Sequence, residues 1–354
     1  MATVFDELFE RFGAEKAPFM HRMRHAWRDE RPLDGLRIAH NIPLTLTTLL
    51  KLDCLQLAGA DLTVSSYSYC PPDDTALVML KAANIPFKPV DSMTGSYDVL
   101  MDCGAELLTR CDASLGAVEL TRTGAVAYER ADPAYPLVSV DNTRLKQLET
   151  CLGTGEGVYR SICNLSGRSL EGAHVVIFGF GKVGRGIAHY FGEIAGKVSI
   201  VEMLADRQES AASRGYITVS GSHKLEVEEL VETADVVVTA TGRASVISDY
   251  YEAEAFRQGA ILANAGAEDE YGLDFDPEEI LFNKGPVNFA EAEPTQMQFL
   301  DPIFYAHNMA VLDLLAKPKA GFHVLNPVVD DAVMRDWCAF HGRTEAELQA
   351  IFGN

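Results

Sequence analysis

The stretch from Val175 to Glu202 constrains this chain most. It opens with a four-residue apolar run, Val175 to Phe178, which is typical of a buried parallel strand. A G-x-G-x-x-G turn from Gly179 to Gly184 follows at once and leads into a helical pattern. A second apolar run then ends on Glu202. The order strand, glycine turn, helix, strand and acid predicts a dinucleotide-binding unit.

Each glycine of the turn has a separate task. Gly179 permits the tight bend, Gly181 lets the backbone approach a pyrophosphate, and Gly184 lets helix and strand pack closely. The helix N-terminus, at Lys182 and Val183 in the turn, adds free N–H groups and the positive end of a dipole. The acid at the end of the second run can accept hydrogen bonds from a ribose 2′-hydroxyl and would repel a 2′-phosphate. We therefore predict NAD, rather than NADP, as the cofactor.

Size and charge exclude several classes of function. The chain has 354 residues, enough for two domains with their own cores. Its formal net charge of −21 disfavours nucleic acid and anionic membranes as partners, because both are bound largely through Lys and Arg. No apolar run reaches the ~18 residues of a membrane span, and the N-terminus lacks a signal-peptide core. We expect a cytoplasmic protein with a small-molecule substrate.

The seven cysteines are scattered, and no C-x-x-C pair occurs among them. This pattern indicates neither a zinc site nor a disulfide framework, so we expect reduced thiols and no metal.

Strand-like and helix-like segments alternate before the glycine turn. The expected strands are 36–39, 62–65, 99–102 and 117–120, the expected helices are 44–57 and 73–83, and His40 falls in a loop. Such alternation predicts a parallel sheet. The predicted fold is therefore α/β with two domains. A parallel-sheet substrate domain covers 1–160 and is completed by about 295–354, and a Rossmann NAD-binding domain covers 161–294.

Two more apolar runs follow Glu202, and each ends in polar residues. Ligands of open α/β sheets bind outside the carboxyl ends of the strands. We therefore expect further cofactor contacts from the residues at these ends, which are Thr239, Thr241, Gly242, Asn264 and Gly266.

Over most of its length the chain resembles the NAD-dependent S-adenosyl-L-homocysteine hydrolases. Residues 18–24 and 31–39 resemble that family's opening helix and first strand, and 239–242 and 264–266 resemble its cofactor turns. Residues 119–124 (ELTRTG) are similar to a loop that touches the cofactor, which implies cofactor contacts for Thr121 and Thr123. In the family, NAD oxidises a ribose 3′-hydroxyl, a 5′ substituent is eliminated, water adds, and the ketone is reduced again.

The resemblance implies catalytic and substrate residues, several of which differ here. The family's catalytic lysine and aspartate fall on Leu145 and Glu149, and Lys146 lies one step away, about 100° around a helix. The glutamate that reads adenine falls on Thr47. The implied catalytic residues are Lys146, Glu149, Asp74 and His40. The implied substrate-binding residues are Thr45, Thr47, Asp74 and Glu119.

Three functions stay open at this point. The first is an NAD-dependent enzyme that acts on a nucleoside-like or other hydroxylated small molecule by transient oxidation, elimination or addition, and reduction. The second is a net oxidoreductase that exchanges NAD with solvent, and the third is an inactive NAD-binding regulatory homologue. No counterpart of the family's C-terminal lysine–tyrosine tail follows Asn354, so we expect a homodimer, with a tetramer as the alternative.

Overall fold

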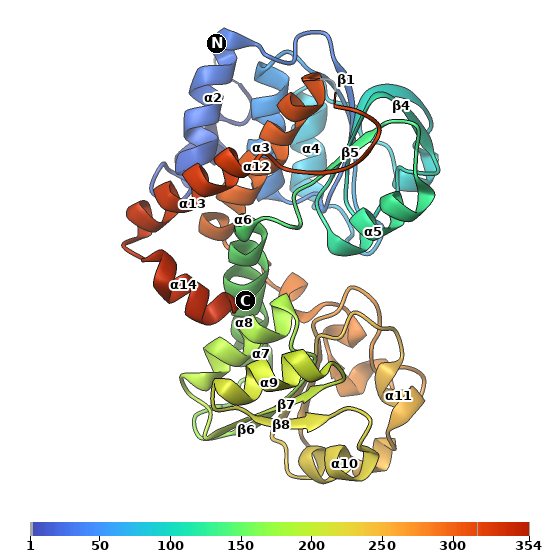
Figure 1. The fold of residues 1–354 in the computed structure, drawn as a ribbon, viewed down its shortest axis with the longest axis vertical. Coiled ribbons are helices and arrows are strands. Elements are labelled where there is room, and N and C mark those ends of the chain that lie inside the picture. The colour runs from blue at the N-terminus through green and yellow to red at the C-terminus, as the bar shows by residue number, and fades with distance from the viewer. Residues whose placement is uncertain (1–2, 317, 354) are drawn as a thin grey trace. The chain divides into compact units, whose positions relative to one another are not determined.

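A computed structural model describes residues 3–316 and 318–353 and divides the chain into two compact units (Figure 1). Unit 1 is Met1–Lys146 with Met297–Gly342, and unit 2 is Gln147–Gln296 with Arg343–Asn354. Each unit contains a sheet in which every described strand pair is parallel, which confirms the predicted α/β class. No helix in the described residues is long and apolar enough to cross a membrane.

The sheet of unit 1 has the strand order β12-β5-β4-β3-β1-β2. The order reverses between β1 and β3, because the chain goes from β1 to β2 on one side and returns to β3 on the other. A ligand is expected at the carboxyl ends of the strands beside such a reversal. The strands are β1 (Arg37–Asn41), β2 (Asp61–Ser65), β3 (Gly95–Asp102), β4 (Cys111–Glu119), β5 (Pro136–Ser139) and β12 (Gly321–Val324).

Helices cover both faces of this sheet. Tyr128 of α5 packs against Ala39, Leu100 and Ala117 on one face. Successive strand residues point to opposite faces, so the next position along each strand faces the other side, where α3 and α12 lie. The helices of unit 1 are α1 (Asp6–Arg11), α2 (Pro18–Glu30), α3 (Leu46–Leu57), α4 (Asp74–Ala82), η1 (Val90–Ser92), α5 (Arg122–Ala131), α12 (Met297–Leu315) and α13 (Pro327–His341).

The sheet of unit 2 has the order β11-β10-β9-β6-β7-β8. Numbered from its own first strand this is 6-5-4-1-2-3, the strand order of dinucleotide-binding sheets, with its reversal between β6 and β9. The strands are β6 (His174–Phe178), β7 (Lys197–Glu202), β8 (Ile217–Ser220), β9 (Val236–Thr239), β10 (Ile261–Asn264) and β11 (Ile280–Leu281).

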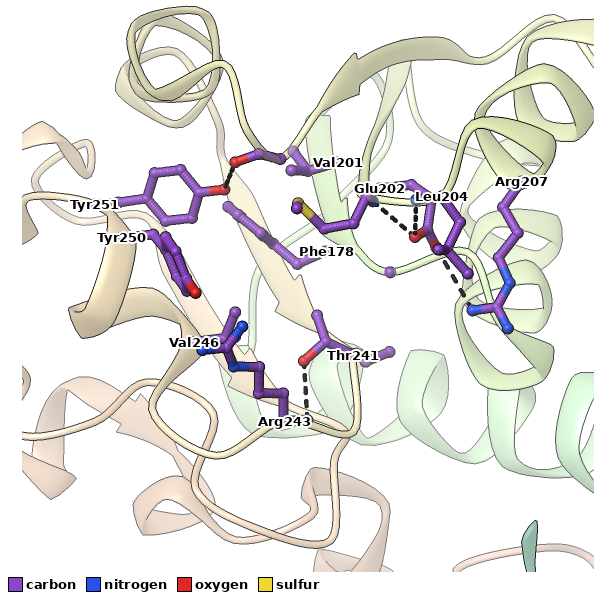
Figure 2. A pocket seen from close by; sticks show the side chains of 14 residues that line it. Phe178, Val201, Glu202, Leu204, Arg207, Thr241, Arg243, Val246, Tyr250 and Tyr251 are labelled. Atoms are coloured by element: carbon purple, nitrogen blue, oxygen red, sulfur yellow. Dashed lines mark hydrogen bonds and ion pairs between the residues drawn. The ribbon is translucent and has the colours of Figure 1, made fainter. Parts of the chain in front are cut away.

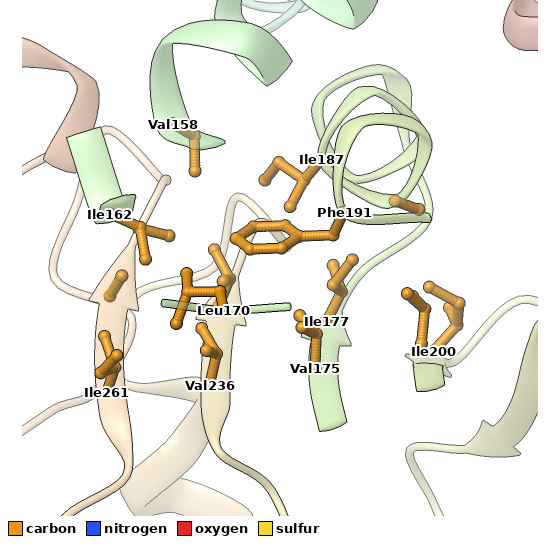
Figure 3. Close-up of a cluster of buried hydrophobic side chains, with 14 of the residues drawn as sticks. Val158, Ile162, Leu170, Val175, Ile177, Ile187, Phe191, Ile200, Val236 and Ile261 are labelled. Atoms are coloured by element: carbon orange, nitrogen blue, oxygen red, sulfur yellow. The ribbon is translucent and has the colours of Figure 1, made fainter. Parts of the chain in front are cut away.

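The helices of unit 2 pack on this sheet over a core of aliphatic side chains. Figure 3 shows Val158 and Ile162 of α7 with Phe191 of α8 above Val175 and Val236 of the strands. The helices are α7 (Gly155–Ser166), α8 (Lys182–Gly192), α9 (Ala205–Ser213), α10 (Lys224–Glu232), α11 (Val246–Tyr250), α14 (Glu345–Phe352) and the short η3 (Ala253–Ala255), η4 (Pro277–Glu279), η5 (Phe282–Lys284) and η6 (Val287–Ala290).

The glycine-rich segment before the dinucleotide unit is helical throughout. Helix α6 (Arg144–Gln147) continues into a π-helix, η2 (Leu148–Thr154), and then into α7. Its glycines serve close packing: a Cβ on Gly155 would lie 2.6 Å from the backbone of Gly186, and a Cβ on Gly186 would overlap the carbonyl oxygen of Cys151. Helices approach this closely only where no side chain intervenes.

Two local predictions were wrong. His40 lies in strand β1 and not in a loop, because it pairs in register with Val64 and Met101. The last segment, Arg343–Asn354, groups with unit 2 and not with the substrate domain, because α14 packs on α8. Neither pairing can be read from local sequence, since both depend on distant residues.

Candidate functional site

A pocket of about 250 Å³ opens in unit 2 where β6, β7 and β9 end (Figure 2). Glu202 and Arg207 stand on one side of it, and Arg243 and the tyrosines of α11 stand on the other. The lining residues are Phe178, Gly179, Val201, Glu202, Met203, Leu204, Arg207, Gly221, Ala240, Thr241, Arg243, Val246, Tyr250 and Tyr251.

The glycine turn fits a dinucleotide for reasons that the backbone shows. Gly179 has φ +96°, and a Cβ there would lie 2.5 Å from the carbonyl oxygen of Ala240. A Cβ on Gly184 would overlap the carbonyl oxygen of Gly179. Helix α8 starts at Lys182 directly after Gly181, so the N–H groups of its first turn lack intrahelical partners and can bind a phosphate.

Glu202 is held in place by backbone donors. Its Oε2 accepts a hydrogen bond from the N–H of Phe180 at 2.8 Å, and its Oε1 accepts from Met203 at 2.7 Å and Leu204 at 3.0 Å. A carboxylate has about four acceptor positions, so capacity remains for a ribose hydroxyl. The side chain is fixed at the pocket wall before any ligand arrives.

Two arginines of the pocket were missed by the sequence analysis as site residues. Arg207 Nη1 lies 3.8 Å from Glu202 Oε2 and 3.6 Å from the position that a Cβ on Gly181 would take. Arg243 lies over the ring of Tyr250 at 4.8 Å. Neither belongs to a glycine or strand-end pattern, so only the folded loops reveal their positions.

The two loops after β9 and β10 are tied together by buried polar groups. Thr241 lines the pocket, and Glu270 accepts hydrogen bonds from its N–H, from its Oγ1 and from the N–H of Gly242. Thr239 and Asn264 are fully buried and bond each other at 3.1 Å, and Gly266 donates its N–H to Asn264. Glu270 was also missed, because it lies in an acidic run without a recognisable pattern.

In unit 1, buried acids organise the carboxyl edge of the sheet. Asp102, at the end of β3, accepts hydrogen bonds from Asn41 Nδ2 at 3.2 Å and from Tyr128 Oη at 2.9 Å. Burial and the charge of Glu119 raise the pKa of Asp102 to about 8. Glu119 is itself fully buried, and its carboxylate accepts from the backbone N–H groups of Gly104, Ala105 and Thr121. The predicted substrate ligand Glu119 therefore holds two loops of this edge.

The other predicted residues of unit 1 lie at helix starts. Thr45 caps α3 and bonds Thr47 Oγ1 at 2.8 Å. Asp74 is exposed in the first turn of α4, whose cap is Asp73, and the N–H of Asp73 donates to the carbonyl of Leu44 at 2.9 Å. The starts of α3 and α4 are therefore neighbours. Thr121 caps α5 through the N–H of Gly124, and Thr123 is exposed.

A group of buried bases lies on the α3 and α12 side of the same sheet. Lys51 Nζ lies 3.0 Å from His40 Nε2, and both residues are fully buried. Burial and the charge of Lys51 lower the pKa of His40, and the same two causes lower the pKa of His307, to which Lys146 adds. Lys146 is buried at the end of α6, where its N–H donates to Thr143 Oγ1 at 3.1 Å. His40 and Lys146 therefore share one basic region of unit 1.

Glu149 belongs to unit 2 and lies in the π-helix η2. Such helices are rare and occur often at functional sites.

Comparison with known proteins places these sites in a family context. Residues 151–278, inside unit 2, match the family model described as S-adenosyl-L-homocysteine hydrolase, NAD binding domain. The chain is adenosylhomocysteinase-like. It is 28% identical over 275 residues to an adenosylhomocysteinase of Aeropyrum pernix, a match that covers 70% of this chain and 64% of that protein. It is 24% identical over 281 residues to an S-inosyl-L-homocysteine hydrolase of Methanopyrus kandleri, with 72% and 65% covered.

The adenosylhomocysteinase-like chain thus spans slightly less than two thirds of the length of these curated relatives. Among solved structures, a dipicolinate synthase from Bacillus halodurans has a similar fold, with a TM-score of 0.54, 12% identity, and 80% of this chain and 99% of that chain covered. The match of residues 151–278, together with the glycine turn and Glu202, identifies NAD as the cofactor, as predicted.

Proposed function

We propose that this chain is an NAD-dependent enzyme that transiently oxidises a hydroxyl of a nucleoside-like small molecule, promotes elimination or addition, and reduces the product. The observation that carries the proposal is a preformed ribose-binding pocket, with Glu202 fixed by three backbone donors, inside a segment that matches the NAD-binding domain of S-adenosyl-L-homocysteine hydrolase. Bound NAD supplies the acceptor and donor of hydride.

The substrate is proposed to bind at the carboxyl edge of the unit 1 sheet, beside the reversal between β1 and β3. Lys146 is proposed as the base that removes the hydroxyl proton at its Nζ. A lysine acts as a base only as the free amine, and burial favours that form. In support, the side chain of Lys146 is 6% exposed, and its charge acts on His307 and on the thiol of Cys103, which follows β3.

A base other than adenine is favoured by Thr47. Its side chain is buried and bonded to Thr45, so it presents no carboxylate to an adenine amino group. The relatives include enzymes named for adenosyl and for inosyl substrates, which is consistent with a variable base.

One experiment separates this function from its alternatives. The purified protein is denatured and the released nucleotide is identified; the native protein is then mixed with adenosine, inosine, other nucleosides and simple polyols while the near-ultraviolet absorbance of NADH is followed. Enzyme-bound NADH that appears and then decays supports the proposal. Stoichiometric release of NADH indicates a net dehydrogenase instead, and no NADH with any compound indicates an inactive homologue.

The role of Lys146 has a matched test. Lys146→Ala is expected to abolish formation of bound NADH while the affinity for NAD stays unchanged. Lys88→Ala removes an exposed lysine of the same unit and is expected to leave both unchanged. Full NADH formation by Lys146→Ala would remove this residue from the mechanism.

A further inference from the structure

The carboxyl end of α14 rests on two arginines. Arg185 of α8 donates from Nη1 to the carbonyl of Phe352, and Arg214 Nη1 donates to the carbonyl of Ile351 at 2.6 Å. The last carbonyls of a helix lack intrahelical partners and form the negative end of its dipole. Both guanidinium groups therefore satisfy acceptors that α14 leaves open.

The residue after α14 fits this arrangement closely. Gly353 has φ +73°, and a Cβ there would collide with the guanidinium of Arg214. The helix is also fixed at its start by a capping box between Thr344 and Glu347, and Leu348 and Phe352 are buried. The proposed function uses no residue of this segment.

Both arginines also hold Phe180, the residue between the first two glycines of the turn. Their guanidinium carbons lie 5.9 Å (Arg185) and 5.6 Å (Arg214) from the centre of its ring, and Arg185 Nε donates to the Phe180 carbonyl at 3.3 Å. The ring is fully buried and packs edge-on against Tyr216 at 5.8 Å. A cation over an aromatic face stabilises this position.

Phe180 in turn orients the ribose ligand, since its N–H is the donor to Glu202 Oε2 at 2.8 Å. A continuous chain of contacts therefore runs from α14 through the arginines and Phe180 to Glu202. Phe180, Arg185 and Arg214 do not line the pocket. Their influence on a bound dinucleotide is consequently indirect, through the position of the turn.

We infer that α14 is an intramolecular latch on the glycine turn, and that Arg214 is a positioning residue that raises the affinity of unit 2 for NAD and NADH. The inference rests on NAD binding by unit 2 and does not depend on the reaction proposed above. Loss of one arginine would release one side of the Phe180 ring, and the N–H that orients Glu202 would then sample other positions.

The test measures cofactor affinity and not turnover. NADH is titrated into the full-length chain and its fluorescence gives the Kd, for the unmodified protein and for Arg214→Gln, Arg214→Lys and Arg168→Gln. Arg168 is the matched control, because it also donates to a backbone carbonyl of unit 2, that of Gly259 at 2.8 Å, at an exposed site. Arg214→Gln is expected to raise the Kd about tenfold, the effect of one lost charge-assisted hydrogen bond.

The lysine variant should restore part of the affinity, since it can still donate to the carbonyl of Ile351, and Arg168→Gln should bind as the unmodified chain does. A chain that ends at Gly342 should bind NADH as weakly as Arg214→Gln, and adding Arg214→Gln to it should change nothing further, because both remove the same contact. An unchanged Kd for Arg214→Gln, or effects of truncation and substitution that multiply, would overturn the latch. If the shortened chain does not fold, the full-length series decides alone. If the unmodified chain binds no NADH, NAD binding itself fails.

Discussion

The N–H of Phe180 donates to Glu202 Oε2 at 2.8 Å, so the glycine turn and the acid at the end of β7 form one unit before the cofactor binds. The turn presents N–H groups to a pyrophosphate, and the acid presents oxygen atoms to a ribose. Since both are fixed by the same residue, the distance between the two recognition elements is set by the fold. This preorganisation reduces the entropy that binding must otherwise supply.

Replacement of the acid should change cofactor choice. Glu202→Gln keeps the shape but loses the charge, so the Kd for NAD should rise by a factor of about ten or more, as expected for a hydrogen bond to a charged group. Discrimination against NADP should fall as well, because the repulsion of a 2′-phosphate is removed. Titration of both nucleotides measures this, with Glu209→Gln, an exposed acid of α9, as the control. Unchanged discrimination would show that Glu202 does not contact the ribose.

The crossing of η2 and α8 depends on a missing side chain. Gly186→Ala places a Cβ on the carbonyl oxygen of Cys151, so the helices must separate, and the free energy of unfolding should fall by about 1–3 kcal/mol. Gly192→Ala in the same helix meets nothing closer than the Tyr216 hydroxyl at 3.6 Å. It should leave stability unchanged or raise it by up to about 1 kcal/mol. Denaturant unfolding measures both, and equal effects would contradict the crossing.

Buried Lys51 should make stability depend on pH. Burial lowers its pKa well below 10.5 in the folded state, so unfolding takes up a proton wherever the pH lies between the folded and unfolded pKa values. Stability from this group is therefore full above pH 10.5 and is lost as the pH falls toward the folded pKa.

Lys51→Met removes this titration. The slope of the unfolding free energy against pH should decrease by up to about 1.4 kcal/mol per pH unit below pH 10.5. Unfolding at pH 6 and pH 9 measures the slope. Lys81→Met, at an exposed position of α4, should keep the slope of the unmodified chain, and an unchanged slope for Lys51→Met would mean that the lysine stays charged when folded.

Two adjacent aspartates should separate stability from substrate binding. Asp73 Oδ1 caps α4 by accepting from the N–H of Ala76 at 2.8 Å, so Asp73→Ala should cost about 1 kcal/mol of stability. Asp74 is exposed and caps nothing, so Asp74→Ala should leave stability unchanged and weaken substrate binding. Thermal unfolding and substrate titration distinguish them. A loss of stability in Asp74→Ala with intact substrate binding would assign the residue to the fold alone.

The sequence by itself determined the dinucleotide unit. Val175 to Phe178, the glycine turn and Glu202 form one local pattern, because a strand, a tight bend and a helix start each depend on residues that are neighbours in the chain. The alternation of strands and helices likewise predicted both parallel sheets. The local pattern failed for His40, whose strand pairing with Val64 and Met101 depends on residues more than twenty positions away.

Only the tertiary structure decided which side chains meet. Lys51 and His40 lie eleven positions apart, and His307 joins their region from α12, while Glu270 reaches back to Thr241 across a loop. The latch between Arg214 and Ile351 joins residues 137 positions apart. Such contacts arise when helices and strands pack, since packing is governed by shape and burial over the whole unit and leaves no periodic signal at either partner.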